Sequence, residues 1–548
     1  MRLASRLTRL SALALGLAYA SASLGCATED GGNGSDDPGI ADDFEVIPDG
    51  KVDNYRSSNT QEFSATATAV VALDASFASK NADERLAAAR ELVSAKLLQI
   101  GWFLNLWVSD KEPEDVNRNY GSYHAMARAS SVKALEVKAT GTLTFSYNFE
   151  ATIAAGDGFL AKLPGRNVSG GGKMVDLNMG LIDNATLLAG TWQSSYGVHS
   201  WDPSTVAPDK LEILPVLVKP APRSANAFLN YAALYADGKL TVGAQFGWDY
   251  NEGRQDLANA RQLYDDLVRA GFTSPVTKYD DLKLGSGPLT RTSLVGGNTV
   301  DVEVTLIHPG MVASASANAA ELRAALLDLL ATREVILFNG HAGVSGRLLP
   351  ADFKSASAGN ILASEYPTLR LLPGYQLLLI EGCQTYATFT DGFRKNPAKR
   401  GPNGELVNMD IVTSTSYTWT SQGAEAMEAI LWPLVGRSAR SAVKASTWDD
   451  VLRTLNAPPN NTSFLGVNGI DNDPHAHPFA KPANLGKSCT TTTQCGGDGN
   501  MCMRPTPGAT RKVCGTVCLD DAGCGSGYRC QLVANAGTVA KTGGCIKR

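Results

Sequence analysis

The sequence predicts an α/β protein in which helices cover both faces of a mostly parallel sheet, with a mixed α+β domain before it and a small disulfide-rich module after it. From Gly238 onward, apolar strand patterns alternate with helical patterns, which is typical of a parallel α/β sheet. Earlier in the chain, residues 145–153 alternate apolar with polar or small side chains, as half-buried strands do. Between Cys489 and Cys545 the chain has eight of its ten cysteines, which indicates a disulfide framework.

The chain begins with a predicted secretory signal, residues 1–25. Three arginines precede the apolar run 10–22, which is shorter than a membrane span. Cys26 follows Ser-Leu-Gly, a pattern that resembles a bacterial lipobox, so we expect this cysteine to carry a lipid. The alternative is ordinary signal cleavage, which would leave Cys26 as a thiol.

Residues 26–55 form a predicted flexible tether. The stretch 27–50 contains acidic residues, glycine, asparagine and serine but no basic residue. Such a segment repels itself and buries too little apolar surface to fold. Together with the signal and the lipid, it predicts a protein that is exported across the inner membrane and anchored in the outer membrane or at the cell surface.

The composition indicates globular domains and argues against a nucleic-acid partner. A chain of 548 residues with 44% hydrophobic and 19% charged residues is too long for one core, so we expect about two to four domains. The net charge is -5 and no basic run stands out, whereas a nucleic-acid interface needs a basic face to neutralise phosphates.

Residues 56–225 are predicted to form the α+β domain, which would serve as a prodomain or a substrate-binding module. Besides the strand pattern at 145–153, apolar residues follow Asn81 at helical spacing from Leu86 to Ile100. Asparagine is a favourable N-cap, so a helix should begin directly after it.

Residues 226–482 are predicted to form the α/β domain. The patterns predict strands at 240–246, 276–282, 300–308, 335–341, 375–383 and 410–417. They predict helices at 254–270, 317–331 and from about residue 422. Two of the strands end in side chains that suit catalysis, namely His341 and Cys383.

Cys383 and His341 are the candidate nucleophile and base. The carboxyl ends of parallel strands meet at one sheet edge, where catalytic residues lie in such folds. A thiolate needs a neighbouring group to accept its proton, and an imidazole does so near neutral pH. Gly382 and the small residues around His341 would leave backbone N–H groups open to an oxyanion. Alternatively, Cys383 is a buried apolar side chain or the disulfide partner of an unlipidated Cys26.

These strand ends resemble those of the caspase-like superfamily of cysteine peptidases, specifically legumain and the gingipains. Leu379-Ile-Glu-Gly-Cys383 is similar to the legumain strand that ends in the catalytic cysteine, and His341 precedes it by a similar distance. Gly247–Arg254 and Thr413–Trp419 resemble further segments of legumain and of the gingipains, in the same order. The likeness extends over about residues 229–480 and implies a caspase-like fold.

The resemblance implies a role for each matching residue. Cys383 would attack the peptide carbonyl, His341 would protonate the leaving amine, and the N–H groups of Cys383 and Gly343 would hold the oxyanion. Asn251 would orient the histidine, and Arg254 would line the specificity pocket.

The same resemblance assigns Trp419 to cover a bound side chain. The charge of the pocket could come from Asp249, Asp256 or Glu425, which leaves open whether the pocket takes a basic or an Asn-like side chain.

The sequence thus predicts an exported, membrane-anchored bacterial cysteine endopeptidase that acts on proteins or peptides through a His–Cys dyad and requires no cofactor. It makes no prediction of an oligomeric state. A second hypothesis is a catalytically inactive surface adhesin or assembly lipoprotein of the same fold. It is motivated by the cysteine module and by Ala342, which stands where the family has glycine after the histidine.

Residues 483–548 are predicted to be a duplicated cysteine module. Each half would form two disulfides, and its four cysteines allow three pairings. Zinc binding is the alternative, but the halves lack a C-x2-C pair and follow an export signal, which favours disulfides. The cysteines are Cys489, Cys495, Cys502 and Cys514 in the first half and Cys518, Cys524, Cys530 and Cys545 in the second.

The stretch 471–477 is either a linker or a metal site. Its carboxylates suit calcium and its imidazoles suit zinc. The candidate ligands are Asp471, Asp473, His475 and His477.

Overall fold

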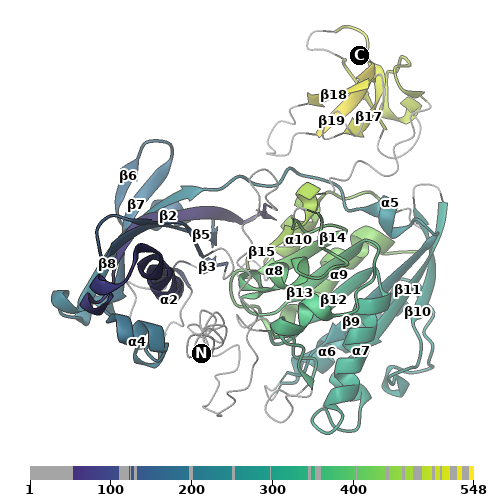
Figure 1. Cartoon of the computed structure of the whole chain (residues 1–548). Coiled ribbons are helices and arrows are strands. Elements are labelled where there is room, and N and C mark those ends of the chain that lie inside the picture. Colours follow the sequence, from purple (N-terminus) through teal and green to yellow (C-terminus); the bar gives the residue numbers. More distant parts are fainter. Residues whose placement is uncertain are drawn as a thin grey trace.

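The structure of the chain, a computed structural model, contains an eight-stranded, a seven-stranded and a four-stranded sheet (Figure 1). It describes residues 54–109, 123, 125–128, 132–196, 201–249, 253–295, 298–342, 347–351, 359–402, 404–439, 443–458, 463–472, 484–495, 500–505, 509–518, 528–533 and 542–547.

The eight-stranded sheet is mostly parallel. Its five central strands run parallel, and antiparallel strands complete both edges. In order across the sheet, the strands are β1 (Arg56–Ser57), β15 (Leu465–Asn468), β14 (Met409–Ser414), β13 (Gln376–Glu381), β12 (Val335–Asn339), β9 (Lys239–Phe246), β11 (Asn298–Ile307) and β10 (Leu289–Val295).

Helices cover both faces of this sheet, because its central strands are apolar on both sides (Figure 1). In β12, Leu337 belongs to the core formed with α6, α9 and α10, whereas Ile336 and Phe338 belong to the core formed with α7 and α8. The mixed α/β architecture predicted from the alternating patterns is therefore confirmed. The helices are α5 (Tyr231–Leu234), α6 (Gln255–Arg269), α7 (Ala319–Thr332), α8 (Phe389–Arg394), α9 (Gly423–Val435) and α10 (Trp448–Leu455).

One predicted strand is wrong. Residues 276–282 contain the 3-10 helix η7 (Tyr279–Asp281), and the edge strand is β10, which pairs antiparallel with β11. The ring of Tyr279 stacks on His308, with 5.4 Å between the ring centroids. The missed signal was the Gly296-Gly297 dipeptide between β10 and β11, which is typical of a tight hairpin.

The seven-stranded sheet is antiparallel and carries the long helix α2 (Ala82–Val108) on one face (Figure 1). The strand predicted at 145–153 is part of β5, and it pairs with β2 along their whole lengths. The strands are β3 (Ala125–Ala127), β5 (Thr144–Gly156), β2 (Thr60–Ala72), β8 (Leu211–Pro220), β7 (Gly172–Gly180) and β6 (Arg166–Val168) in order, with β4 (Lys133–Ala139) also paired to β5. Two short helices, α3 (Phe159–Lys162) and α4 (Asn184–Ala189), complete this unit.

Helix α2 begins where the sequence predicts. The side chain of Asn81 accepts a hydrogen bond from the backbone N–H of Glu84 at 2.9 Å, and the Glu84 carboxylate accepts one from the Asn81 N–H at 3.1 Å. This capping box pairs two N–H groups that the first turn of a helix leaves without partners.

The first described residues tie the two larger sheets together. Strand β1 pairs antiparallel with β15, and after a short turn the chain continues as β2 of the other sheet. The guanidinium of Arg56 donates to both carboxylate oxygens of Asp449 at 2.6 and 2.7 Å. Tyr55 packs over Gly466, where a Cβ atom would lie 2.1 Å from the tyrosine ring. The start of the predicted range 56–225 therefore pairs with the eight-stranded sheet.

The four-stranded sheet forms the cysteine module. Disulfides join Cys489 to Cys502 and Cys495 to Cys514, so the disulfides predicted within the first half are confirmed. Cys530 and Cys545 are also disulfide-bonded, and the side chains of the remaining two cysteines of the second half lie outside the described residues. In order, the strands are β16 (Asn500–Met503), β17 (Val513–Cys518), β19 (Thr542–Lys547) and β18 (Tyr528–Val533).

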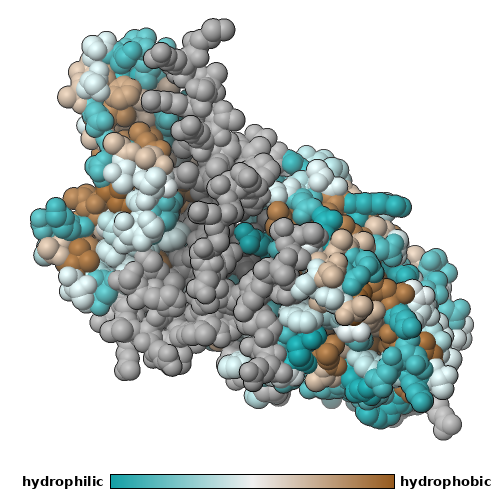
Figure 2. Space-filling view, turned by 90° about the horizontal axis from the view of Figure 1, so that it is seen from below, coloured by the Kyte–Doolittle hydropathy of each residue, from teal (hydrophilic) through white to brown (hydrophobic). Residues whose placement is uncertain are grey.

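Figure 2 shows hydrophilic and hydrophobic side chains interspersed over the lower face of the molecule. Within the described part of the chain, no helix combines the length and apolar character needed to cross a bilayer. Short 3-10 helices connect the larger elements at Ala75–Ser79 (η2), Gln193–Ser195 (η4), Pro203–Thr205 (η5), Pro208–Lys210 (η6), Pro309–Met311 (η8), Ala363–Thr368 (η10), Thr385–Ala387 (η11), Thr420–Gln422 (η12), Ile470–Asn472 (η14) and Thr492–Cys495 (η16).

Candidate active site

Three neighbouring strands bring Asp249, His341 and Cys383 to one edge of the eight-stranded sheet. Strands β12 and β13 pair in parallel with Asn339 opposite Glu381, so His341 and Cys383 follow their strands at the same level. Asp249 follows β9, which pairs with β12 on its other side. The two residues of the predicted dyad thus lie at the carboxyl ends of adjacent parallel strands.

A glycine at the end of each strand lets the three backbones approach closely. A Cβ atom on Gly382 would lie 2.5 Å from the Cβ of Ala342. On Gly340 it would lie 2.9 Å from the Cα of Gly247, and on Gly247 it would lie 2.4 Å from the carbonyl oxygen of Leu349. These glycines therefore pack the sheet edge tightly beneath the polar residues, and the N–H of Gly340 donates to the carbonyl of Glu381 at 3.1 Å.

A carboxylate lies beside the imidazole. Nε2 of His341 is 3.7 Å from Oδ1 of Asp249, which is an ion-pair distance longer than a hydrogen bond. The other oxygen of Asp249 accepts a hydrogen bond from the backbone N–H of Gln255 at 3.0 Å, which fixes the carboxylate at the start of α6. Asn251, to which the resemblance assigned the orienting role, lies outside the described residues. From the sequence, Asp249 is expected only as a possible acid of the specificity pocket.

Cys383 is not a free thiol in this structure. It is disulfide-bonded, and its partner is not among the described residues. Cys26, the partner considered from the sequence, also lies outside them. Only 4% of Cys383 and 3% of His341 is exposed. The expectation of an unpaired, accessible thiol is wrong for this state, because an oxidised and enclosed sulfur cannot act as a nucleophile.

The oxyanion hole that the resemblance implies is described only in part. Gly343 lies outside the described residues, whereas the backbone at Cys383 is described. Ala342, directly before Gly343, forms an isolated antiparallel β-bridge with Leu348. The N–H of Leu349 donates to the carbonyl of His341 at 3.2 Å. Of the two residues whose N–H groups the resemblance assigns to the oxyanion, the structure therefore describes only Cys383.

A buried carboxyl group lies directly before Cys383. The side-chain amide of Asn339 donates to Oε2 of Glu381 at 3.0 Å. Burial raises the pKa of Glu381 to about 8, the hydrogen bond from Asn339 opposes this rise, and the charge of Glu425 adds to it. Gly423 at the start of α9 makes room for this pair, since a Cβ there would lie 2.2 Å from Oδ1 of Asn339. The sheet edge thus holds a carboxyl group that is mostly protonated at neutral pH.

Arg254, predicted to line the specificity pocket, is committed to a neighbouring acid. It precedes α6 with a left-handed backbone (φ 41°), and its guanidinium donates to both carboxylate oxygens of Asp256 at 2.9 and 2.8 Å. The guanidinium also lies 3.8 Å from the ring centroid of Trp248. Burial raises the pKa of Asp256, and the hydrogen bonds and charge of Arg254 lower it. Arg254 therefore reaches the same sheet edge with its charge already balanced.

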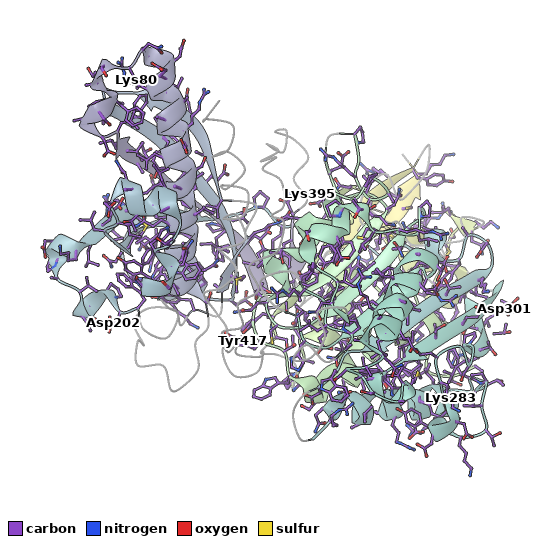
Figure 3. All side chains as sticks on the ribbon, turned by 60° about the horizontal axis from the view of Figure 1, so that its bottom comes forward. Lys80, Asp202, Lys283, Asp301, Lys395 and Tyr417 are labelled. Atoms are coloured by element: carbon purple, nitrogen blue, oxygen red, sulfur yellow. A yellow bond between two sulfur atoms is a disulfide. The ribbon has the colours of Figure 1, made fainter. Side chains whose placement is uncertain are left out.

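Trp419, predicted to cover a bound side chain, is 61% exposed and directly precedes η12. Tyr417, two residues earlier, lies on the side of the eight-stranded unit that faces the seven-stranded unit (Figure 3). The indole of Trp419 is therefore largely open to solvent.

Of the four candidate metal ligands in the stretch 471–477, the structure describes only Asp471. Oδ2 of Asp471 accepts hydrogen bonds from the N–H of Asn54 and the hydroxyl of Ser224, both at 3.0 Å. This carboxylate therefore ties together segments that are far apart in sequence. The other three candidate ligands, Asp473, His475 and His477, lie outside the described residues.

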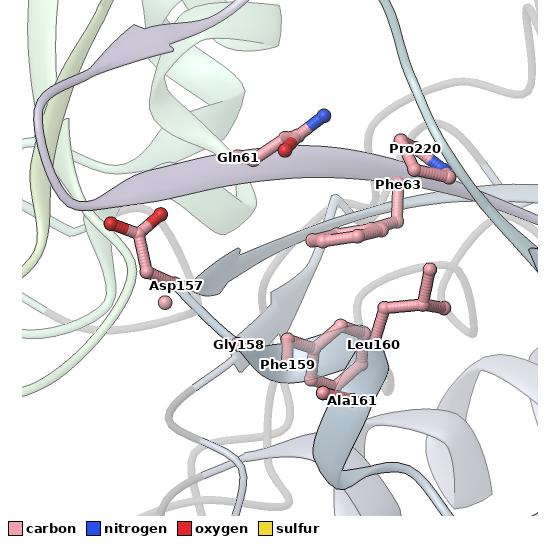
Figure 4. Close-up of a pocket in the computed structure, with 9 residues that line it drawn as sticks. Gln61, Phe63, Asp157, Gly158, Phe159, Leu160, Ala161 and Pro220 are labelled. Atoms are coloured by element: carbon pink, nitrogen blue, oxygen red, sulfur yellow. The ribbon is translucent and has the colours of Figure 1, made fainter. Parts of the chain in front are cut away.

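Two cavities lie away from the candidate dyad. One, of about 180 Å³, lies beside α3 in the seven-stranded unit, and Figure 4 shows Phe63, Phe159 and Leu160 turned toward it. The other, of about 290 Å³, lies beside α9 and is lined by Glu428 and Arg437 among others. Burial raises the pKa of Glu428 to about 7. Neither cavity is lined by a residue that the sequence singled out for catalysis.

Comparisons with known proteins give little support for a family. No family model matches the chain, and no curated protein matches it. Among solved structures, the chain is similar to the crystal structure of the Arg-specific cysteine proteinase gingipain R, with a TM-score of 0.27 and 9% sequence identity over 57% of this chain and 67% of that chain. A likeness of this size does not establish a shared fold.

Proposed function

We propose that the chain is a cysteine-type endopeptidase whose eight-stranded unit has a caspase-like fold. The observation that carries the proposal is the position of Cys383 and His341 after adjacent parallel strands in register, with Asp249 3.7 Å from the imidazole. A nucleophile, a base and a group that orients the base are the parts that thiol-dependent acyl transfer requires.

The reaction would follow from these groups once Cys383 is reduced. His341 takes the thiol proton, the sulfur attacks the peptide carbonyl carbon, and the C–N bond breaks as His341 passes the proton to the leaving amine. Water then attacks the thioester with His341 as base, which releases the carboxylic acid and restores the thiol. Asp249 would stabilise the imidazolium, and the N–H groups of Cys383 and Gly343 would hold the oxyanion.

The oxidised state of Cys383 makes the proposed enzyme latent. A thiol reductant has to supply two electrons and two protons to convert the disulfide into two thiols before the sulfur can attack. Substrate also has to reach a site whose two reacting side chains are almost fully enclosed. We therefore expect activity only after reduction.

The test is hydrolysis of a peptide library by the reduced full chain, read by mass spectrometry. Wild type should cleave, whereas Cys383→Ala and His341→Ala should not. The cleaved bonds would also show whether the pocket takes a basic or an Asn-like side chain. A reduced wild type that neither cleaves nor is labelled by a thiol-reactive peptide probe would overturn the proposal.

The second candidate is a catalytically inactive surface adhesin or assembly lipoprotein. The observation that favours it is Cys383 itself, which is disulfide-bonded and 4% exposed. A reduced chain that stays unlabelled at Cys383 while it remains folded would support this candidate and contradict the peptidase.

We also propose that residues 1–25 are removed on export, with residues 26–55 as the tether, and that the Cys26 sulfur carries the membrane anchor. A sulfur that carries this lipid cannot also be the disulfide partner of Cys383. The support is the apolar run and the Ser-Leu-Gly-Cys sequence. The intact mass of protein extracted from bacterial membranes should correspond to a chain that begins at a diacylglyceryl-modified Cys26. A mature chain with unmodified Cys26 would contradict the anchor.

A further inference from the structure

The segment that follows Cys383 is held by the seven-stranded sheet. In η11, the hydroxyl of Tyr386 donates to Oε1 of Glu62 in β2 at 2.5 Å. In α8, Asp391 accepts from the guanidinium of Arg128, which follows β3, with Nε at 3.1 and 3.0 Å from its two oxygens and Nη2 at 2.8 Å from Oδ1. Two contacts from the other sheet thus hold the chain shortly after the candidate nucleophile.

These contacts are buried. Glu62, Arg128, Asp391 and Tyr386 are each exposed by 6% or less. Burial raises the pKa of Glu62, while the charge of Arg128 and the hydrogen bond from Tyr386 lower it. Burial alone would lower the pKa of Arg128, but Asp391, Tyr386 and Glu62 raise it above its usual value. A buried charge that loses its partner strongly destabilises the fold. The four side chains are therefore held in one arrangement relative to one another.

The ring of Tyr386 is fixed as firmly as its hydroxyl. It packs edge-on against Tyr55, with 5.2 Å between the centroids, and lies in a small apolar cluster with Met126, Ala154 and Ala387. The hydroxyl of Tyr55 in turn donates to the carbonyl of Phe464 at 3.3 Å.

Little backbone separates Tyr386 from Cys383. Gln384 has a left-handed backbone (φ 56°), which is unfavourable for a residue with a side chain and persists only where the surroundings hold it. Its N–H donates to the carbonyl of Ser416 at 3.0 Å, and the hydroxyl of Thr385 donates to the carbonyl of Ile380 at 3.1 Å. The backbone at Cys383 is therefore held by β13 on one side and by the Tyr386 network on the other.

We propose that Glu62 and Arg128 are positioning residues for Cys383, acting through Tyr386 and Asp391, so that the seven-stranded unit stays part of the working enzyme. This inference rests on the proposed peptidase function. Residues 56–225 are then not a prodomain that leaves on activation, because its departure would remove both contacts to the segment after Cys383. The unit instead orients the Cys383 sulfur and the N–H that would face the oxyanion.

The test compares Tyr386→Phe with Tyr375→Phe. Each change removes one buried hydroxyl that donates to a carboxylate, Glu62 in the first case and Asp410, at 2.7 Å, in the second. Tyr375 directly precedes β13, at the end of the strand away from Cys383. The two variants therefore differ mainly in their distance from the nucleophile.

Two readouts are compared in reduced full-length protein: kcat and KM on a peptide found in the library digest, and the pH dependence of iodoacetamide alkylation at Cys383, followed by peptide mass spectrometry. For Tyr386→Phe we expect kcat to fall by roughly 10-fold or more with KM little changed, and the alkylation profile to shift. Tyr375→Phe should change neither by more than about twofold.

Equal effects of the two variants on both readouts, or none, would overturn the inference. If Tyr386→Phe does not fold, Arg128→Lys takes its place, because it keeps the charge but loses the paired contacts to Asp391. If reduced wild type cleaves no peptide, the proposed function fails, whereas the alkylation comparison still decides whether the network positions Cys383.

Discussion

Glu381 illustrates how burial changes the chemistry of a single side chain. Its folded pKa of about 8 lies above the value of about 4.3 expected in an unfolded chain. Between these values, the folded protein keeps a proton that the unfolded chain has released. The stabilising contribution is therefore complete below about pH 4.3 and is lost as the pH rises through 8.

Glu381→Gln should remove this pH dependence. In wild type, the free energy of unfolding should decrease by up to about 1.4 kcal/mol per pH unit between pH 5 and 8 because of this group. The variant keeps an acceptor for Asn339 but has no proton to lose, so its stability should decline less over this range. Urea titrations at pH 5, 6, 7 and 8 measure the difference, with Glu136→Gln as a surface control. Parallel profiles for Glu381→Gln and wild type would show that the carboxyl is ionised throughout.

Asp249→Asn should lower kcat strongly and change the free energy of unfolding little. The amide oxygen can still accept the N–H of Gln255, but the charge beside the imidazolium is lost. We expect a fall in kcat on the order of 10²-fold. Asp183→Asn is the matched control, because Asp183 also accepts a backbone N–H at a helix start, in the other sheet's unit. A kcat unchanged by Asp249→Asn would remove the carboxylate from the mechanism.

Among the elements, those with local signals were predictable from the sequence. The start of α2 follows from Asn81 and its capping box, and β5 follows from its alternating pattern. The residues that hold these elements together were not predictable. Tyr386 and Glu62 are 324 positions apart, and nothing in either neighbourhood signals the other. The order of the strands that brings Asp249 to His341 likewise arises only in the folded sheet.

Arg291 also makes contacts that neither neighbourhood in the sequence signals, because it caps the C-terminal ends of two helices. Arg291 lies in β10, and its guanidinium donates to the carbonyl of Ala270, directly after α6, at 2.8 Å. At the end of α9 it donates to the carbonyl of Val435 and, at 2.9 Å, to that of Gly436. It also lies 4.5 Å from the ring centroid of Phe272. The last carbonyls of both helices thus obtain partners that the helices themselves cannot supply.

Arg291→Met should destabilise the protein by about 3 kcal/mol, because buried carbonyls lose their donors. Arg269→Met, at the exposed end of α6, should cost under about 1 kcal/mol. Thermal or urea unfolding of the two variants provides the measurement. A similar small effect for both would mean that water replaces the guanidinium.

For the whole molecule, the oxidation state of Cys383 decides whether the proposed chemistry is available. We expect no alkylation of Cys383 when the protein is unfolded in guanidinium without reductant, and complete alkylation when a reductant is added first. Cys489, which pairs with Cys502, is the internal control and should respond in the same way. Alkylation of Cys383 without reductant would show a free thiol and remove the need for activation.

Strand β1 has a consequence for how the protein is made. The N–H of Asn54 bonds to Asp471, which is 417 residues later in the chain. A ribosome adds about 5–20 residues per second, so Asn54 is made roughly 20–80 s before its partner Asp471. The pairing of β1 with β15, which completes one edge of the eight-stranded sheet, therefore forms only late in translation or after it.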